Sequence, residues 1–451
     1  MSRQVNRRQF IKSTSLTGAG FWVAGSRARA RGRLANSAIG FACIGIAGKG
    51  SSDSNDAAKH GDIVAICDID TNRLDGAAQR FPNARKFTDF REMLTTMDKY
   101  IDAVTVSTPD HTHAVASAMA MKMGKHCFCQ KPLTHSLGEA RRLGEIARQM
   151  KVVTQMGNQG TAGDGLRRSA AMLRAGVIGP VKEVHVWTDR AIWPQGVARP
   201  EPQPVPKHVR WDLFLGPAPP RPFAPFVSDR RDKAGYHPFA WRGWWDFGTG
   251  ALGDMACHIM NMPFMGLDLR DPITVEAESS DHNRDSYPLW SVIRYEFGPY
   301  GDRPPLSMIW YDGGKHLPEK KKPPLALFQG ERRGDNGALL IGRQGTLYCP
   351  DATGQRYVLL PNGGIVEPEV QFTPAPPEGH FSEFARAIES GSEAVSNFPD
   401  FAGPLTETVL LGNLAVWSGK KIEWDAKTLK AKNNSEVDAI IRPEYRQGWT
   451  L

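Results

Sequence analysis

The chain has 451 residues, of which 41% are hydrophobic and 23% charged; these are proportions of a folded globular protein and exclude a wholly disordered chain. The formal net charge is +8, but residues 1–33 contain eight arginines and lysines and no acid, so the other 48 basic residues balance the 48 acidic ones. A neutral body has no broad positive field, which excludes a nucleic-acid partner.

The N-terminal segment has the pattern of a targeting signal. Asn6–Lys12 (NRRQFIK) resembles the twin-arginine export signal, and the weakly apolar stretch Ser13–Gly25 follows it. That stretch is too short to span a membrane, and Ala28-Arg29-Ala30 offers a small-residue cleavage site. We expect residues 1–33 to be a signal peptide that directs a folded bacterial protein to the periplasm through the twin-arginine machinery, with no integral membrane segment in the mature chain. The alternative is a disordered basic tail.

Residues 34–157 alternate between short apolar runs and helical patterns. The apolar runs are Ile39–Ile44, Ile63–Cys67, Ala103–Ser107, His126–Cys129 and Val152–Gln155. The helical patterns are Asn72–Phe81, Arg91–Thr95, His113–Met123 and Ser136–Met150. This alternation predicts a parallel sheet with helices on both faces, which binds ligands at the carboxyl ends of its strands.

A glycine-rich loop follows the first apolar run. It approximates the dinucleotide fingerprint G-x-G-x-x-G, with an alanine at the middle glycine position. Such a loop lets the backbone approach a pyrophosphate at a helix N-terminus. The predicted cofactor-binding residues of the loop are Gly45, Ala47, Gly48 and Gly50.

Asp68 ends the second apolar run, 23 residues after Gly45. An acid at about this spacing binds the ribose diol of NAD and repels the 2′-phosphate of NADP. We therefore expect NAD as cofactor, with NADP still open because Arg73 lies nearby. The alternative for Asp68 is a helix N-cap or turn residue.

Further motifs carry a family resemblance. They are Ser107–His113 (STPDHTH), Gln130-Lys131-Pro132, Trp193–Gly196 (WPQG) and Trp241–His258 (WRGWWDFGTGALGDMACH). Together they resemble the glucose–fructose oxidoreductase / inositol dehydrogenase (Gfo/Idh/MocA) family, and most closely an exported subgroup of it. The resemblance implies a Rossmann domain, residues 34–157, followed by an α+β domain, residues 158–451, with an open, mostly antiparallel sheet for substrate binding and oligomerisation.

The same resemblance implies the catalytic residues. The family lysine falls on Lys131, and its Asp-x-x-x-His pair falls on Asp254 and His258. The family glutamate before the lysine is Gln130 here, which removes a negative charge. In hydride transfer, His258 would take the hydroxyl proton, Lys131 would stabilise an alkoxide, and Asp254 would orient the imidazole or hold a second hydroxyl. The alternatives are a surface lysine, a surface ion pair or a metal site; we expect no metal.

The strand ends also supply expected contacts with the cofactor. These residues are Thr108, Pro109, His111, His113, Gln130 and Lys131. For the two histidines the alternative is a structural loop and N-cap cluster.

The second domain is rich in tryptophan between Trp187 and Trp245, and aromatic planes pack well on sugar rings. The alternatives for these tryptophans are sheet cores and oligomer interfaces. The expected substrate-binding residues are Gln159, Asp189, Arg190, Trp193, Gln195, Arg242 and Trp245. The proline-rich residues 194–240 predict a long irregular excursion, either a lid or an arm around a partner subunit of a homo-oligomer.

Three functions follow. The first is an NAD(P)-dependent oxidoreductase acting on a hydroxyl of a sugar, inositol or glycoside. The second is a glycosidase or lyase that uses tightly bound NAD for transient oxidation of a ring hydroxyl. The third is a sugar-binding protein without turnover, against which the intact Lys131, Asp254 and His258 argue. All six cysteines are expected to be free thiols, because most lie in or beside buried strands.

Overall fold

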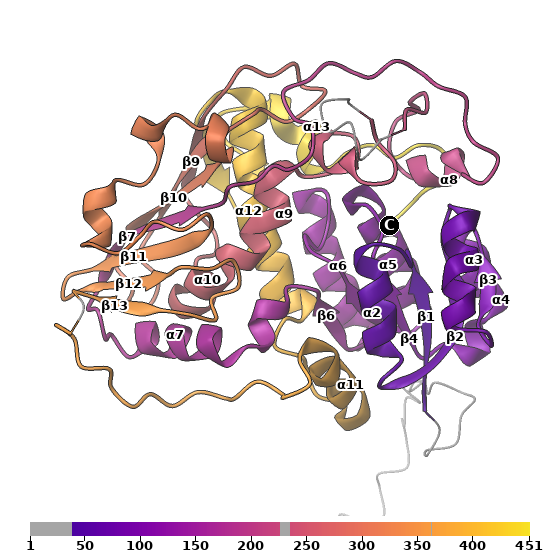
Figure 1. Ribbon diagram of the computed structural model, residues 1–451, viewed down its shortest axis with the longest axis horizontal. Coiled ribbons are helices and arrows are strands. Elements are labelled where there is room, and N and C mark those ends of the chain that lie inside the picture. Colours follow the sequence, from indigo (N-terminus) through magenta and orange to yellow (C-terminus); the bar gives the residue numbers. More distant parts are fainter. Residues whose placement is uncertain (1–37, 226–234, 362) are drawn as a thin grey trace, which may run out of the picture.

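The computed structural model describes residues 38–225, 235–361 and 363–451, so the predicted signal peptide lies outside the described residues. Two β-sheets stand side by side, with helices packed around and between them (Figure 1). The six cysteines are free and buried, as predicted. Within the described ranges, no helix is both long and apolar enough to cross a membrane.

The first sheet has six parallel strands in the order β3-β2-β1-β4-β5-β6. Their bounds are β1 Ile39–Ile44, β2 Gly61–Cys67, β3 Arg85–Phe87, β4 Ala103–Val106, β5 His126–Cys129 and β6 Thr154–Met156. Five of these strands match the predicted apolar runs. The edge strand β3 was not predicted, because it has only three residues and two of them are exposed.

Five helices cover this sheet (Figure 1). They are α2 Lys49–Ala57, α3 Thr71–Arg80, α4 Phe90–Thr96, α5 Asp110–Lys122 and α6 Leu137–Met150. Asp70 caps α3 and Asp89 caps α4 through their side chains, and Ser136 with Glu139 forms a capping box on α6. Helix α5 begins three residues before the predicted start at His113, because its first turn consists of buried polar residues and shows no apolar periodicity.

The second sheet has nine strands in the order β13-β12-β11-β7-β10-β9-β8-β14-β15. Only the β7–β10 pairing is parallel among the described residues. The bounds are β7 Val181–Trp187, β8 Thr274–Ser279, β9 Ser291–Phe297, β10 Leu306–Asp312, β11 Gly337–Gly342, β12 Thr346–Cys349, β13 Val358–Leu360, β14 Ile422–Asp425 and β15 Lys430–Ala431. The predicted fold class, a Rossmann domain followed by a mostly antiparallel α+β domain, is confirmed.

Helices between the two sheets join them into one core. They are α7 Asp164–Arg174, α9 Gly250–Ile259, α10 Asn261–Leu267 and α12 Gly403–Ser418. Helix α12 is buried almost all round and contacts α6 of the first domain and α9 of the second. Helix α11 (His380–Ser390) packs Phe381 and Phe384 onto Phe128 of β5. The chain therefore crosses back to the Rossmann domain late in the sequence, and the boundary at residue 157 stays a prediction.

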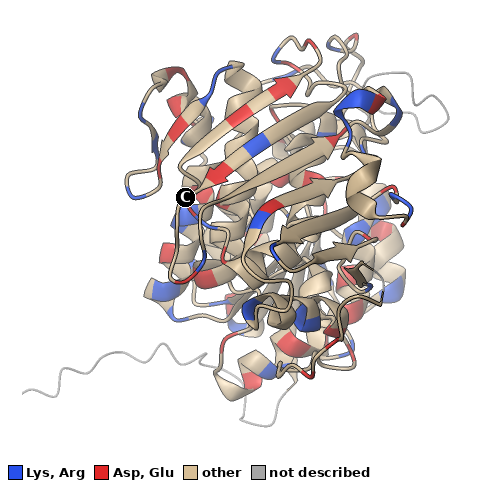
Figure 2. Ribbon diagram, turned by 90° about the vertical axis from the view of Figure 1, so that its left-hand side faces the viewer, with Lys and Arg blue, Asp and Glu red and all other residues tan. Residues whose placement is uncertain are grey.

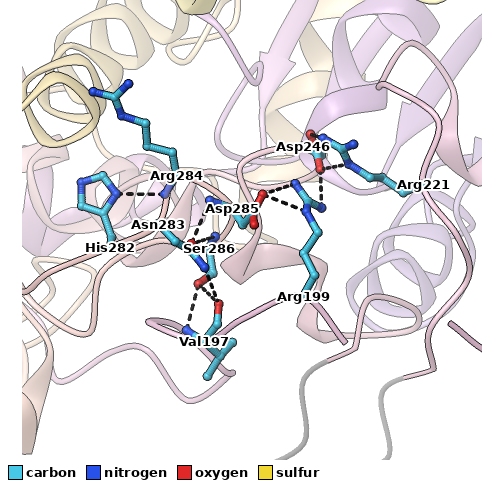
Figure 3. Close-up of polar contacts among 9 residues, drawn as sticks. All are labelled: Val197, Arg199, Arg221, Asp246, His282, Asn283, Arg284, Asp285 and Ser286. Carbon is cyan, nitrogen blue, oxygen red and sulfur yellow. Dashed lines mark hydrogen bonds and ion pairs between the residues drawn. The ribbon is translucent and has the colours of Figure 1, made fainter. Parts of the chain in front are cut away.

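The proline-rich residues 194–240 form an irregular excursion, as predicted, with one short helix in their described part, α8 (Trp211–Leu215). Ion pairs hold this excursion against the segments that follow it (Figure 3). Arg199 lies 3.0 Å from the Asp246 carboxylate and also pairs with Asp285. Arg221 lies 2.7 Å from Asp246. After the last helix, α13 (Asp438–Ile441), the C-terminal end of the chain lies over the Rossmann domain (Figure 1).

Candidate active site

A cavity of about 580 Å³ lies at the carboxyl ends of the Rossmann strands, where helix α9 faces them. It brings together residues from both domains. Those singled out from the sequence that line it are Gly45, Ala47, Gly48, Asp68, Arg73, Thr108, Pro109, His113, Gln130, Lys131, Gln159, Arg190, Trp193, Arg242, Asp254 and His258.

The glycine loop packs so closely that residues larger than glycine at Gly45 and Gly50 would clash with neighbouring backbone atoms. Gly45 has φ +76°, and a Cβ on it would lie 2.6 Å from the Ser107 carbonyl oxygen. A Cβ on Gly50 would lie 1.9 Å from the Gly45 carbonyl oxygen. Gly50 does not line the cavity, and the close contact shows that it lets helix α2 approach the end of β1; its predicted contact with the cofactor stays a prediction.

Asp68 lies where β2 ends and faces the same cavity. Its carboxylate accepts hydrogen bonds from the backbone N–H groups of Ile46 (3.1 Å) and Asp70 (3.0 Å). Burial raises the pKa of this carboxyl, and the backbone donors oppose that rise. Arg73 is engaged in an ion pair with Asp70 at 3.4 Å.

These features fit a dinucleotide. The glycine cradle at the start of α2 leaves room for a pyrophosphate, and the Asp68 carboxylate is the acceptor that a ribose diol requires. The loop would therefore hold the phosphates and Asp68 the adenosine ribose.

A buried carboxylate that was not predicted lies behind the loop. Asp53 on α2 is fully buried and accepts hydrogen bonds from Lys49 Nζ (2.6 Å), Ser107 Oγ (2.7 Å) and Gln130 Nε2 (2.8 Å). Burial raises the pKa of Asp53, and the Lys49 charge opposes this. No pattern in the sequence distinguishes Asp53, because helix α2 contains several other polar residues. The network fixes the Gln130 side chain beside Lys131.

Lys131 forms a buried ion pair with the helix that carries the histidine. Its Nζ lies 2.9 Å from Asp254 Oδ1 and 2.6 Å from the Asp254 carbonyl oxygen. Arg242 Nε approaches the same Oδ1 at 3.3 Å. Burial alone would raise the pKa of Asp254, but the charges of Lys131 and Arg242 lower it to about 2. Asp254 is therefore an anion that positions the lysine.

His258 lies one turn after Asp254 on α9, and its Nδ1 is buried without a hydrogen-bond partner among the described residues. Burial, with the nearby Lys131 charge, lowers the pKa of His258 to about 3. The imidazole is thus neutral and can accept a proton. The prediction that Asp254 orients this ring is not met, since the carboxylate bonds to Lys131 and Arg242 instead.

The two histidines at the start of α5, His111 and His113, differ in whether they line the cavity. His113 lines the cavity, with ring nitrogens 2.9 Å from the carbonyl oxygens of Pro132 and Thr108. His111 does not line it: its ring nitrogens face the carbonyl oxygens of Phe247 and Phe214. The predicted cofactor contact of His111 is therefore corrected, because the ring points into the second domain and joins it to α5.

Four of the seven predicted substrate residues line the cavity: Gln159, Arg190, Trp193 and Arg242. The other three do not line it, and their role in substrate binding stays a prediction. Asp189 pairs with Arg190 at 3.0 Å outside the lining. Gln195 is buried behind Trp193 and accepts from its indole N–H at 2.9 Å. Trp245 stacks on Tyr287 with ring centroids 3.8 Å apart.

The cavity also includes residues that sequence reasoning missed. Asp110, within the STPDHTH motif, is buried and accepts from Thr249 Oγ1 at 2.6 Å. Trp241, one of the tryptophans considered as partners of a sugar ring, also lines the cavity. Leu213, Phe214 and Trp449 had no local signal. No group of three or more His, Cys, Asp or Glu side chains suited to a metal occurs within the described part of the chain.

Comparison with protein families identifies the chain. Residues 39–158 match the Gfo/Idh/MocA oxidoreductase family model for the NAD-binding Rossmann fold, and residues 172–303 match its model for the C-terminal α/β domain. The chain belongs to this family, as its motifs predicted, and its Rossmann domain is the family's NAD-binding domain.

Curated relatives match over short segments. The inositol 2-dehydrogenase of Salmonella typhimurium is 25% identical over 126 residues, 28% of this chain and 37% of the relative. The D-glucoside 3-dehydrogenase of Escherichia coli is 29% identical over 137 residues, 30% of this chain and 37% of the relative. The matches thus span little more than a third of these relatives.

The fold resembles that of solved structures over most of its length. The WlbA dehydrogenase from Bordetella pertussis, crystallised with NADH and UDP-GlcNAcA, aligns with a TM-score of 0.59 at 15% identity, covering 86% of this chain and 99% of that protein. At this identity the likeness concerns the fold alone.

Proposed function

We propose that the protein is an NAD-dependent oxidoreductase that transfers a hydride between nicotinamide and the carbinol carbon of a sugar, inositol or glycoside. The observation that carries the proposal is that one cavity is lined by the dinucleotide residues Gly45 and Asp68 and by the ion-paired Lys131 beside the neutral His258.

The residues of this chain can manage the proton. Nicotinamide, when bound, supplies the hydride acceptor or donor. In the oxidative direction the neutral His258 imidazole is placed to accept the hydroxyl proton, although burial and the Lys131 charge lower its pKa and so weaken it as a base. Lys131 donates a hydrogen bond to the same oxygen as negative charge develops there, and Asp254 holds the ammonium in place.

The cofactor preference follows from charge. The Asp68 carboxylate would repel a 2′-phosphate, and Arg73 is already paired with Asp70. NAD is therefore favoured over NADP.

A carbohydrate is favoured by the far wall of the cavity, where Trp193 and Trp241 offer aromatic planes and Gln159, Arg190 and Arg242 offer hydrogen-bond donors. The names of the relatives, an inositol dehydrogenase and a glucoside dehydrogenase, agree with this class.

A second function is cleavage of a glycosidic bond through transient oxidation. The carbon that bears a ring hydroxyl would give its hydride to NAD while the hydroxyl loses its proton, which leaves a ketone. The ketone would acidify the neighbouring C–H, whose proton is removed by a base as the aglycone leaves. Water would then add to the resulting double bond, and the hydride would return to the carbonyl carbon. Enclosure favours this function: Phe214 and Trp449, from distant segments, border the dinucleotide cavity, which suits a cofactor that stays bound between turnovers.

Mass spectrometry of the denatured, natively purified protein tests the cofactor, and NADH absorbance after addition of candidate sugars tests turnover. Net NADH supports the dehydrogenase; released aglycone without net NADH supports the second function. Sugar binding without either product would leave a binding protein. Failure to bind NAD or NADP would refute both enzymatic functions.

We also propose twin-arginine export to the periplasm, membership of the family's exported subgroup, and homo-oligomerisation. The first two rest on the Asn6–Lys12 motif together with the WPQG and WRGWWDFGTG segments. The third is supported by the nine-stranded sheet, where most positions along the strands are neither acidic nor basic (Figure 2). Fusing residues 1–33 to a fluorescent reporter in cells with and without the export machinery tests the first, and analytical ultracentrifugation tests the third.

A further inference from the structure

We propose that the C-terminal tail, residues 442–451, forms a wall of the adenosine half of the dinucleotide site and retains the bound cofactor. The inference rests on the NAD site of the proposed function and adds to it a binding residue, Trp449, from the opposite end of the chain.

Trp449 lies on the adenosine side of the cavity. It shares the lining with Asp68, which follows β2, and with Phe90, which follows β3. Lys131, by contrast, follows β5, on the other side of β1 in the strand order. Because Asp68 marks the adenosine ribose, the indole borders the part of the cavity beyond that ribose, away from the reacting end.

The indole is held in place from behind. The Trp449 ring centroid lies 5.9 Å from the Phe90 ring centroid. The Arg91 guanidinium carbon lies 4.3 Å from the Trp449 ring centroid. The side chain is buried, with Trp449 only 8% exposed. A flat, fixed apolar plane is the surface on which a purine ring packs favourably, and its preorganisation lowers the entropy cost of binding.

The tail is fastened to helix α8 of the excursion by Arg446. Its Nη2 donates to the Asp212 carbonyl oxygen at 2.7 Å and its Nε to the Gly216 carbonyl oxygen at 3.0 Å, and the guanidinium also pairs with the Asp212 carboxylate. The backbone N–H of Arg446 donates to the Pro217 carbonyl oxygen at 3.0 Å. Tyr445 adds a hydrogen bond to Glu139 of α6 at 2.6 Å.

The excursion is itself fastened to the Rossmann domain. Arg210 N–H donates to the Ile69 carbonyl oxygen at 2.9 Å, and His237 Nε2 lies 3.1 Å from the Asp70 carboxylate. Since Phe214 of α8 and Trp449 both line the cavity, the excursion and the tail border the cofactor site together. Release of the dinucleotide would then require the contacts of Arg446 to open.

The experiment compares full-length variants Trp449→Ala, Trp449→Phe and Arg446→Ala with the control Trp290→Ala. Trp290 lies immediately before β9 of the nine-stranded sheet, beneath the Lys321 ammonium. Calorimetry on nucleotide-stripped protein gives the dissociation constants for NAD and for nicotinamide mononucleotide, which lacks the adenosine half. Circular dichroism verifies folding of each variant.

We expect Trp449→Ala to bind NAD about 10- to 100-fold more weakly, Trp449→Phe to recover part of the loss, and the mononucleotide to bind as in the wild type. Arg446→Ala should also raise the dissociation constant for NAD, and Trp290→Ala should change neither constant. Unchanged NAD binding in Trp449→Ala would overturn this inference alone. If Trp449→Ala does not fold, unchanged NAD binding in both Trp449→Phe and Arg446→Ala would overturn it instead. Equal losses for NAD and the mononucleotide would also overturn it. A wild type that binds neither NAD nor NADP would refute the proposed function as well.

Discussion

The Asp53 carboxylate accepts a hydrogen bond from the Gln130 amide nitrogen at 2.8 Å, deep behind the glycine loop. The family motif has a glutamate where Gln130 stands, and the sequence suggested that a negative charge was lost there. The structure shows a carboxylate from another element, helix α2, in contact with that amide. The amide is therefore the matching neutral donor for a carboxylate whose other partners are Lys49 and Ser107.

Restoring the family glutamate should therefore be harmful. In Gln130→Glu, two buried carboxylates would face each other, and we expect a loss of about 1–3 kcal/mol in unfolding free energy at neutral pH. Adding Asp53→Asn to this variant should recover most of the loss, because one carboxylate and one amide again face each other. Urea denaturation of both variants checks this, and a fully stable Gln130→Glu protein would contradict it.

Asp68 should determine cofactor choice. Asp68→Ala removes an acceptor for the ribose diol and the charge that repels a 2′-phosphate, so NAD should bind about 10- to 100-fold more weakly while NADP gains relative to NAD. Titration calorimetry with both cofactors measures the ratio. Asp75→Ala, at an exposed ion pair with Lys86, is the matched control. An unchanged ratio in Asp68→Ala would argue against the assignment.

Lys131 should be required for chemistry rather than for cofactor binding. Lys131→Met keeps much of the side-chain volume but removes the donor to the substrate oxygen, and we expect kcat/KM to fall by about 100-fold or more. NAD affinity should change little. Lys122→Ala, an exposed lysine in the last turn of α5, serves as control. Steady-state kinetics that are unaltered in Lys131→Met would remove the lysine from the mechanism.

His258 should make the fold sensitive to acid. Its native pKa is about 3, through burial and the Lys131 charge, whereas an unfolded histidine titrates near pH 6.5. The unfolded chain therefore takes up the proton first, so this contribution to stability is complete above about pH 6.5 and is lost as the pH falls toward 3. His258→Gln should reduce the drop in unfolding free energy between pH 7 and pH 5 by up to about 2 kcal/mol.

Chemical denaturation at several pH values measures that slope, with the exposed His316→Gln as control. The slope, rather than the absolute stability, is the readout, since any substitution at a buried site changes the latter. Equal slopes in wild type and His258→Gln would show that the imidazole is not held neutral.

The tertiary structure separates several residues that the sequence analysis had grouped because they are neighbours along the chain. Trp193 lines the cavity, yet Gln195 lies behind it and Asp189 beside it. In an irregular segment side-chain direction has no period, so neighbours in sequence need not share a face. His111 was misplaced for a related reason: helix α5 is buried all round, and the pattern does not tell which partner each side faces.

The sequence by itself determined the local and repetitive features: the strand and helix alternation, and the glycine loop with its acid at the end of β2. Those features depend on periodicity and short spacing, which a single chain displays. That Lys131, Asp254 and His258 share one site was implied by the resemblance of their motifs to the family. Only the tertiary structure decided the long-range ones, such as Asp53 beneath Gln130, Asp254 paired with Lys131 instead of His258, and Trp449 at the dinucleotide cavity. Such contacts join segments up to several hundred residues apart, and they arise from the packing of whole elements, which leaves no local pattern in the sequence.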